Sequence, residues 1–488
     1  MLNCRYLGIS LLTFLVSSTA WAQNYDGSGS PNFVPHTLEE ALATAYLTNP
    51  ELQQERATLR ATDENVSTAH AGWRPTIQTN LAGSIGNMTN TSVGQAQTID
   101  PNTGRVVRGD YVQKARGQLG YNAGVTLSQP IYQGGKTTAQ THQAINQVMA
   151  ERAKLLSTEQ QIFQKVVQAY VGVIQGQQLL QININNEKVL SEQVKATHQR
   201  FKLGEITRTD TAQAEGALAS ARAQRQTAEG ALREAQANYA QVVGIAPPPN
   251  LTPPQPLVLP VKTEQEAIAI ATSNNPDVIT ALFTEAAQKA AVNVAISALM
   301  PKVNAQLTYQ RTANQGTGNY ETDNKMGTLQ MTLPIYQSGS EYSAVRQARQ
   351  QAQAAHKQVD AQRRAAMQLA SSNWQKLQAA KASIASNRSS IAANIVALAG
   401  VEKQVVVGTS TTLEMLQQQQ SLLNSQTALI QNLSTMVTAS YDVAAAMGRL
   451  TAQDLKLNVP HYDYTAYYNA VKNRWWGIND YAQDQPGR

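Results

Sequence analysis

The stretch of sequence that decides the fold is residues 119–133, LGYNAGVTLSQPIYQ, whose ending returns as GTLQMTLPIYQ at residues 327–337. Between Leu119 and Ser128, apolar side chains occupy the odd positions, while glycine and polar side chains occupy the even ones. A similar alternation runs through residues 76–86 and 302–312. A period of two over roughly ten residues is typical of a transmembrane β-strand, which needs about 9–11 residues. The sequence therefore predicts four such strands, at about 76–86, 119–131, 302–312 and 326–335.

The alternation also predicts which side chains meet lipid. Odd-numbered side chains would face the membrane, among them Leu81, Val125, Leu307 and Leu329, while even-numbered ones would face a lumen. Arg311 shares the odd face, so we expect it at the outer rim, beyond the apolar band. A half-buried strand of a soluble sandwich shows the same period. Four strands of one length in an exported chain favour the membrane.

An internal duplication organises the chain. The dipeptide Asn-Pro at residues 49–50 returns at 275–276, 226 residues later, whereas Gly204 returns as Gly408, only 204 residues later. The difference of 22 residues falls in the segment 87–118, which is longer in the first repeat. Because its Asn-, Gly- and Thr-rich composition shows no periodicity, we predict an outer-surface loop there.

The duplicated unit has the order helix, strand, strand, very long helix, turn and helix. We assign residues 1–22 to a signal peptide, 23–245 to the first repeat, 246–262 to a proline-rich linker, 263–450 to the second repeat and 451–488 to a C-terminal equatorial or tail segment. The signal peptide is predicted from Arg5, the apolar run 7–16 and the cleavage signal at residues 20–22. Cys4, the single cysteine, lies inside it, so the exported chain has no disulfide or thiol.

Two very long helices are predicted at residues 136–200 and 340–404, because neither segment contains proline. At 1.5 Å per residue, each would form a rod on the order of 100 Å long. Rods of that length bury little surface alone and normally pair in coiled coils. An isolated fibrous coiled coil would not explain the strand pairs between the helices.

Composition excludes several classes of protein. With 15% charged residues and a mean hydropathy of −0.34, the chain is not a polytopic helical membrane protein. Its net charge of +6 is spread without a basic block, so nucleic acid is not an expected partner. The six histidines are scattered, and no nucleotide-binding or catalytic motif is present. We therefore predict no enzyme activity, no cofactor and no metal, and transport energy that comes from a partner.

Four strands cannot close a barrel, and open strand edges are not tolerated in lipid. Several copies must pool their strands, and three copies would enclose a barrel wide enough for water. The chain resembles the TolC-like family of outer-membrane efflux proteins. The resemblance rests on the duplicated Asn-Pro pairs, the Pro-Ile-Tyr strand ends and the helix turns at residues 200–204 and 405–408; residues 467–477 further resemble the branch that serves type I protein secretion.

The resemblance implies a mainly α protein with membrane β-structure: a homotrimer with a twelve-stranded β-barrel in the outer membrane, continuing into an α-helical periplasmic tunnel. Such a channel is the passive exit duct of a tripartite efflux or type I secretion system. Its implied partners are a periplasmic adaptor, an inner-membrane transporter and outer-membrane lipid. The alternative is a periplasmic coiled-coil adaptor or structural protein without a barrel. Between export of drugs and export of protein, the sequence leaves the choice open.

The resemblance also implies where the functional residues lie. Gly204 and Gly408 would mark the tip where the adaptor docks. Acidic residues line the periplasmic entrance in the family, and the matching positions hold Glu414, its repeat counterpart Asp210, and Gln417 in place of a second acid. Asp210 could instead pair with Arg208. The residues of the family's closing lock are replaced by the two residues Val405 and Ser410.

Overall fold

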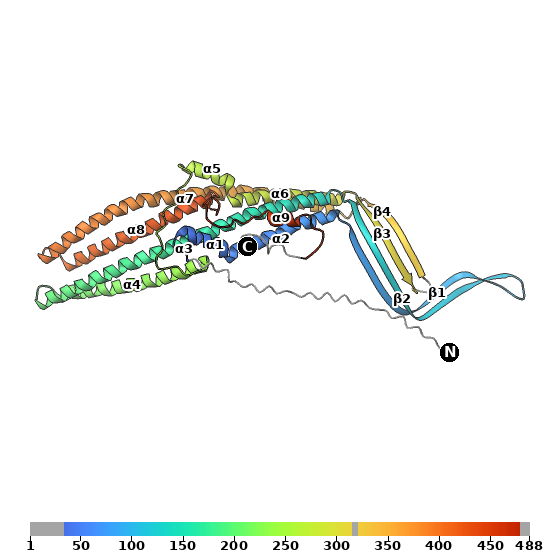
Figure 1. The fold of residues 1–488 in the computed structure, drawn as a ribbon, viewed down its shortest axis with the longest axis horizontal. Coiled ribbons are helices and arrows are strands. Elements are labelled where there is room, and N and C mark those ends of the chain that lie inside the picture. The colour runs from blue at the N-terminus through green and yellow to red at the C-terminus, as the bar shows by residue number, and fades with distance from the viewer. Residues whose placement is uncertain (1–33, 315–320, 479–488) are drawn as a thin grey trace.

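The structure is a computed structural model that describes residues 34–314 and 321–478. The predicted signal peptide and Cys4 lie outside the described residues. Figure 1 shows an elongated molecule with helical hairpins at one end and a sheet at the other. None of the helices among the described residues is both long and apolar enough to cross a membrane.

Four antiparallel strands form one sheet in the order β1-β2-β3-β4. Their bounds are Thr76–Ile99, Val106–Tyr132, Lys302–Ala313 and Glu321–Thr332. The pairing sets Tyr132 against Val303 and Lys302 against Thr332, so β2, β3 and β4 reach about the same level beside the helices. Strand β1 begins farther along the sheet, because Thr76 lies opposite Ser128. Among the described residues, β1 and β4 each have one edge without a partner strand.

The prediction that residues 87–118 form a loop is wrong. Strand β1 continues to Ile99 and β2 begins at Val106, so this segment is the far part of a β-hairpin whose turn lies between them. The ladder continues through two register shifts, between Gly86 and Met88 and between Ser92 and Ala96. This segment has no alternation of apolar side chains, so its strands are held by the cross-strand backbone hydrogen bonds of the ladder. Its many threonines and valines favour extended backbone.

Strand β4 also differs from its predicted span of 326–335. It runs from Glu321 to Thr332, so it begins five residues earlier and ends before Pro334. Its start is set by pairing of Glu321 with Ala313 across the hairpin. The second Pro-Ile-Tyr sequence, residues 334–336, lies beyond β4, whereas the first copy, residues 130–132, lies inside β2 and pairs with β3 through a register shift.

Each repeat carries one long helix, α3 at Lys136–Lys202 and α7 at Ser340–Val406, and both have 67 residues. Each starts after a glycine with φ of +81°, Gly135 or Gly339, a backbone conformation that glycine adopts without strain. The long helices fold back on α4 (Arg208–Val243) and α8 (Thr412–Ala446) as two hairpins. These are the paired rods that the sequence predicts.

The shorter helices explain the duplicated Asn-Pro pairs. Asn49 ends α1 (Leu38–Thr48) and caps α2 (Pro50–His70), while its Nδ2 donates to the carbonyl of Val242 at 3.1 Å. Asn275 does the same between α5 (Glu264–Asn274) and α6 (Pro276–Ile296), donating to Ala446 at 3.2 Å. Both asparagines are buried, so each one joins the end of α4 or α8 to the two short helices of the same repeat.

The main core lies at the level of the short helices α1 and α2, which we call the equator. It gathers apolar residues of α1 to α4 and α8, the linker and the C-terminal segment, which carries the short helix α9 (Ala466–Val471). The guanidinium of Arg56 is buried there, 4.6 Å from the ring of Tyr46 and 5.1 Å from that of Tyr462. Burial raises the pKa of nearby Glu159 to about 7. The C-terminal segment is therefore fastened through a buried cation and aromatic rings.

Candidate functional site at the hairpin tips

The turn at each hairpin tip has the same hydrogen bonds. At the first tip, the amide of Glu205 donates to the carbonyl of Arg200, and that of Gly204 donates to Phe201. At the second, Thr409 and Gly408 donate in the same way to Gln404 and Val405. Gly204 and Gly408 have φ of +76° and +77°, as this form of helix ending requires. Both predicted tip residues therefore terminate the long helices in identical geometry.

The acidic residues at the tips cap the helices that follow. The Oγ1 and amide of Thr207 donate to the Asp210 carboxylate at 2.7 and 2.9 Å, and the amide of Asp210 donates back to Thr207. Glu414 forms the same reciprocal cap with Thr411 and also accepts a hydrogen bond from the hydroxyl of Ser410. This is the capping box, readable in sequence as Thr-x-x-Asp/Glu.

These hydrogen bonds favour the charged form of both carboxylates. Donation from the Thr207 side chain and backbone lowers the pKa of Asp210, and donation from Ser410 and the Thr411 backbone lowers that of Glu414. The Asp210 carboxylate accepts its hydrogen bonds from Thr207, so the alternative pairing with Arg208 is not made in this structure. Arg208 and Gln417 are exposed at the same end of the molecule.

Apolar side chains surround the tip turns and are exposed to solvent. Leu203 is 75% exposed, and Val406 and Val407 are 79% and 73% exposed. Phe201 and Leu413 add to the same surface. Such a cluster at the end of a coiled coil is typical of a surface that binds another protein.

The two tips also contact each other within the chain. The Nη2 of Arg200 donates to the carbonyl of Val405 at 3.4 Å, while the Nε of Arg200 pairs with Glu205 at 3.1 Å. The Val405 side chain is buried, whereas Ser410 uses its hydroxyl on Glu414. The two residues that replace the family's lock thus both have contacts inside their own chain.

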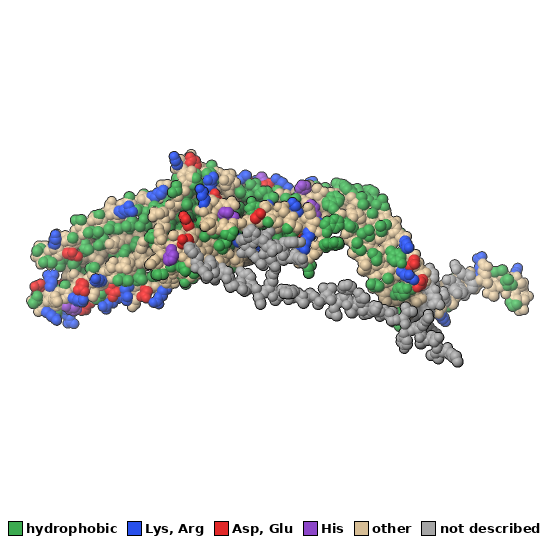
Figure 2. Space-filling view, viewed as in Figure 1, with side chains coloured by type: hydrophobic (Ala, Val, Ile, Leu, Met, Phe, Trp, Pro, Cys, Tyr) green, Lys and Arg blue, Asp and Glu red, His purple; other side chains and the backbone are tan. Residues whose placement is uncertain are grey.

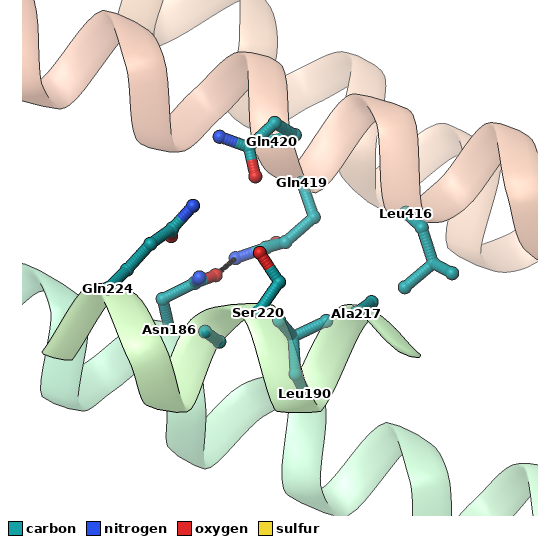
Figure 3. Close-up of a pocket in the computed structure, with 9 residues that line it drawn as sticks. Asn186, Leu190, Ala217, Ser220, Gln224, Leu416, Gln419 and Gln420 are labelled. Atoms are coloured by element: carbon teal, nitrogen blue, oxygen red, sulfur yellow. Dashed lines mark hydrogen bonds between the residues drawn. The ribbon is translucent and has the colours of Figure 1, made fainter. Parts of the chain in front are cut away.

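A polar cavity of about 80 Å³ lies behind the tips, between the two hairpins (Figure 3). The buried Asn186 of α3 accepts a hydrogen bond from the Nε2 of Gln419 of α8 at 3.1 Å. Gln224 and Gln420 extend toward the same space. Asn186 is not among the residues predicted from sequence, although an asparagine inside the apolar stripe of a coiled coil is a recognisable signal.

The predicted lipid-facing residues lie at the opposite end of the molecule. Leu81, Val125, Leu307 and Leu329 are all exposed on the sheet, and Leu81 is 85% exposed. Arg311 pairs with Glu321 at 2.8 Å, farther from the helices than Leu307, and Tyr309 lies between these rows. In Figure 2, charged side chains are sparse over the sheet near the helices and gather at its far end.

Residues 34–314 and 321–478 contain no group of three or more potential metal ligands. The candidate site consists of the two tip turns, the two carboxylate caps, the exposed apolar side chains around the turns (the apolar rim) and the polar cavity between the hairpins.

Comparisons with known proteins agree with this arrangement. The family profile described as "Outer membrane efflux protein" matches residues 41–245 and 267–449. The outer membrane efflux protein BepC of Brucella suis is 34% identical over 91% of this chain and 92% of its own length. The alkaline protease secretion protein AprF of Pseudomonas aeruginosa is 22% identical over 71% of this chain and 72% of AprF. The solved CmeC outer membrane channel of Campylobacter jejuni has a TM-score of 0.69 and 16% identity, covering 89% of each chain.

The predicted TolC-like resemblance, channel-tunnel fold and outer-membrane location are thereby confirmed. From the pairing of long helical hairpins with a sheet of membrane length, and from these matches, the chain belongs to the outer membrane efflux protein family and acts as an exit duct of the outer membrane.

Proposed function

We propose that three copies of the chain assemble into one passive duct. The observation that carries this is the four-stranded sheet, in which β1 and β4 each have one edge that no strand of the described residues covers. Because lipid cannot satisfy free backbone groups, β1 of one copy would pair with β4 of the next. Three sheets would then close a twelve-stranded barrel, and the hairpins would continue it as a tunnel.

The duct would work with a periplasmic adaptor and an inner-membrane transporter. The exposed apolar rim at Leu203, Val406 and Val407 is suited to an adaptor's helical hairpin, which would pack against the tips as in coiled-coil pairing. The alternative of a periplasmic adaptor or structural protein has no support, since the matched family is one of outer-membrane channels.

Two classes of cargo are compatible with the duct. BepC is named an efflux protein, and AprF is named for secretion of an alkaline protease. BepC matches more of this chain than AprF does, and at higher identity, which favours efflux. The aromatic segment at residues 467–477 resembles the branch that serves type I secretion, which favours export of protein.

At the entrance, Glu414 of the three copies would form an acidic ring. The side chain is exposed at the first turn of α8, and hydrogen bonds from Ser410 and the Thr411 backbone lower its pKa, which favours the ionised form. A ring of carboxylates concentrates cations and repels anions in a narrow passage. Asp210, which caps α4 in the same way, would contribute a second charge at this level.

Glu414→Gln is expected to reduce the cation preference of single channels in planar bilayers and to weaken block by multivalent cations. Glutamine is accepted at this position of a capping box, so the helix start should survive the change. Glu402→Gln, on the exposed surface of α7, is the matched control and should leave selectivity unchanged. Unaltered selectivity in Glu414→Gln would remove this residue from the entrance while leaving the duct intact.

An epitope inserted at Asn102 is expected to be reachable by antibody on intact cells without loss of export. Asn102 lies in the turn between β1 and β2, at the end of the hairpin farthest from the helices. Turn tips tolerate insertion because few contacts depend on them. Labelling only after the outer membrane is permeabilised would reverse the proposed topology.

A further inference from the structure

The end of the described chain is fastened beside the junction of helices and strands. Helix α9 packs on α2 and α3: Tyr468 contacts a cluster that contains Val66 and Val148, and Val471 is fully buried. The Tyr467 hydroxyl donates to the Glu64 carboxylate at 3.0 Å. These contacts hold α9 in place, so the residues that follow it start from a defined position.

The next residues are held by their backbone. The carbonyl of Arg474 accepts hydrogen bonds from Ser67, near the end of α2, and from the Nη1 of Arg74. The same Arg74 guanidinium lies 5.1 Å from the centre of the Trp475 ring. Gly477 follows with φ of +103°, and a Cβ there would lie 2.6 Å from the Arg474 guanidinium. These contacts fix the turn at residues 474–477, and its backbone conformation requires glycine at position 477.

This fixed backbone presents its largest apolar side chains outward. Trp475 is 67% exposed, Trp476 is 89% exposed, and the side chain of Ile478 is fully exposed. Two adjacent exposed indoles on an anchored turn are unusual for a surface that meets only water.

The position of the turn indicates what covers it. Only Pro75 separates Arg74 from β1, and Ile77, 71% exposed, begins the row of outward apolar side chains. From Arg74 to Ile77 an extended chain spans about 10 Å. Tyr132, at the end of β2, and Tyr336, just after β4, are exposed at the same end of the sheet. The indoles therefore lie at the level where the membrane strands meet the periplasm.

We propose that Trp475 and Trp476 form an interfacial anchor that inserts into the headgroup region of the periplasmic leaflet of the outer membrane. Tryptophan is enriched at membrane–water interfaces, where its ring is apolar and its N–H remains hydrated. Arg74 and Arg474 place two guanidinium groups beside the indoles, which complements the phosphates of phospholipid. The C-terminal segment would then tie the equator of the tunnel to the membrane surface. The inference rests on the proposed membrane placement of the strands.

The test is tryptophan quenching in the processed protein, which lacks Trp21 because the predicted signal peptide has been removed, reconstituted in phosphatidylethanolamine and phosphatidylglycerol vesicles. The probe is phospholipid brominated on acyl carbons near the glycerol or near the chain ends. One variant, Trp73→Phe/Trp374→Phe, retains the pair at 475 and 476. A second, Trp73→Phe/Trp475→Phe/Trp476→Phe, retains Trp374, which is buried in a helical core cluster. A third carries Leu81→Trp with the four described tryptophans changed to Phe.

The anchor predicts that the pair at 475 and 476 loses about half of its emission with bromine near the glycerol and less with bromine near the chain ends. Trp374 should be unaffected by either lipid. Quenching of Leu81→Trp without quenching of the pair would overturn the anchor while the strands remain in the membrane. The anchor also fails if the pair is protected from both bromine and aqueous acrylamide, since a second copy would then cover it. If Leu81→Trp is not quenched, the membrane placement itself fails.

Discussion

Leu81→Arg is expected to block assembly of the protein in the outer membrane, whereas Gln78→Arg, three residues earlier on the same strand, is expected to be tolerated. Leu81 lies midway along the outward apolar row of β1, between Ile77 and Ile85. Arginine on a lipid-facing site near the midplane costs roughly 2–4 kcal/mol. At position 78 the side chain would point into the lumen, where a guanidinium remains hydrated.

The second half of the chain offers an independent copy of this comparison. Leu329→Arg should fail and Gln330→Arg should assemble, because the two residues are neighbours on β4 with opposite orientation. The readout is the amount of heat-modifiable oligomer in the outer-membrane fraction. Equal tolerance of arginine on both faces would show that these strands do not lie in lipid.

Arg56→Ala is expected to lower the free energy of unfolding by about 3–5 kcal/mol, the cost of removing one partner from a buried charge network. Arg56 is 1% exposed, and its Nη2 donates to the carbonyl of Tyr46 at 3.2 Å. Its loss would leave the carboxyl group of Glu159 buried without a nearby cation. Arg233→Ala, which removes an exposed pair with Glu229, is the control and should cost less than about 1 kcal/mol.

Thermal unfolding followed by helical circular dichroism measures this difference, and pH adds a second check. Burial raises the folded-state pKa of Glu159 to about 7, above its ordinary value of 4.5. The stability that protonation contributes is complete below the lower value and is lost as pH rises through the higher one. Glu159→Gln should therefore stabilise the protein at about pH 8 and recover part of the loss in Arg56→Ala. An Arg56→Ala variant as stable as Arg233→Ala would show that the equatorial segment is held by apolar packing alone.

Local patterns in the sequence predict much of this fold. The period-two alternation identifies all four strands, the absence of proline identifies the two long helices, and the two repeat offsets align the halves. The tip glycines at 204 and 408 are placed correctly because a helix ending of this kind needs a left-handed residue.

What the sequence does not predict depends on contacts between distant residues. The far part of the β1–β2 hairpin has no hydrophobic period, and only cross-strand pairing makes it a ribbon. The backbone amide of Tyr462 donates to the hydroxyl of Tyr46, more than four hundred residues away in the chain. The capping role of Asp210 and Glu414 is an exception, because Thr-x-x-Asp/Glu can be read from sequence alone.

Cell fractionation combined with heat-modifiable gel mobility tests whether the protein is a trimeric duct in the outer membrane. The protein is expected in the outer-membrane fraction. Unheated samples should migrate as a species about three times the mass of the chain, which heating converts to the 52.8 kDa chain or its processed form. Recovery of a monomer from the periplasmic fraction, with the same mobility before and after heating, would contradict it.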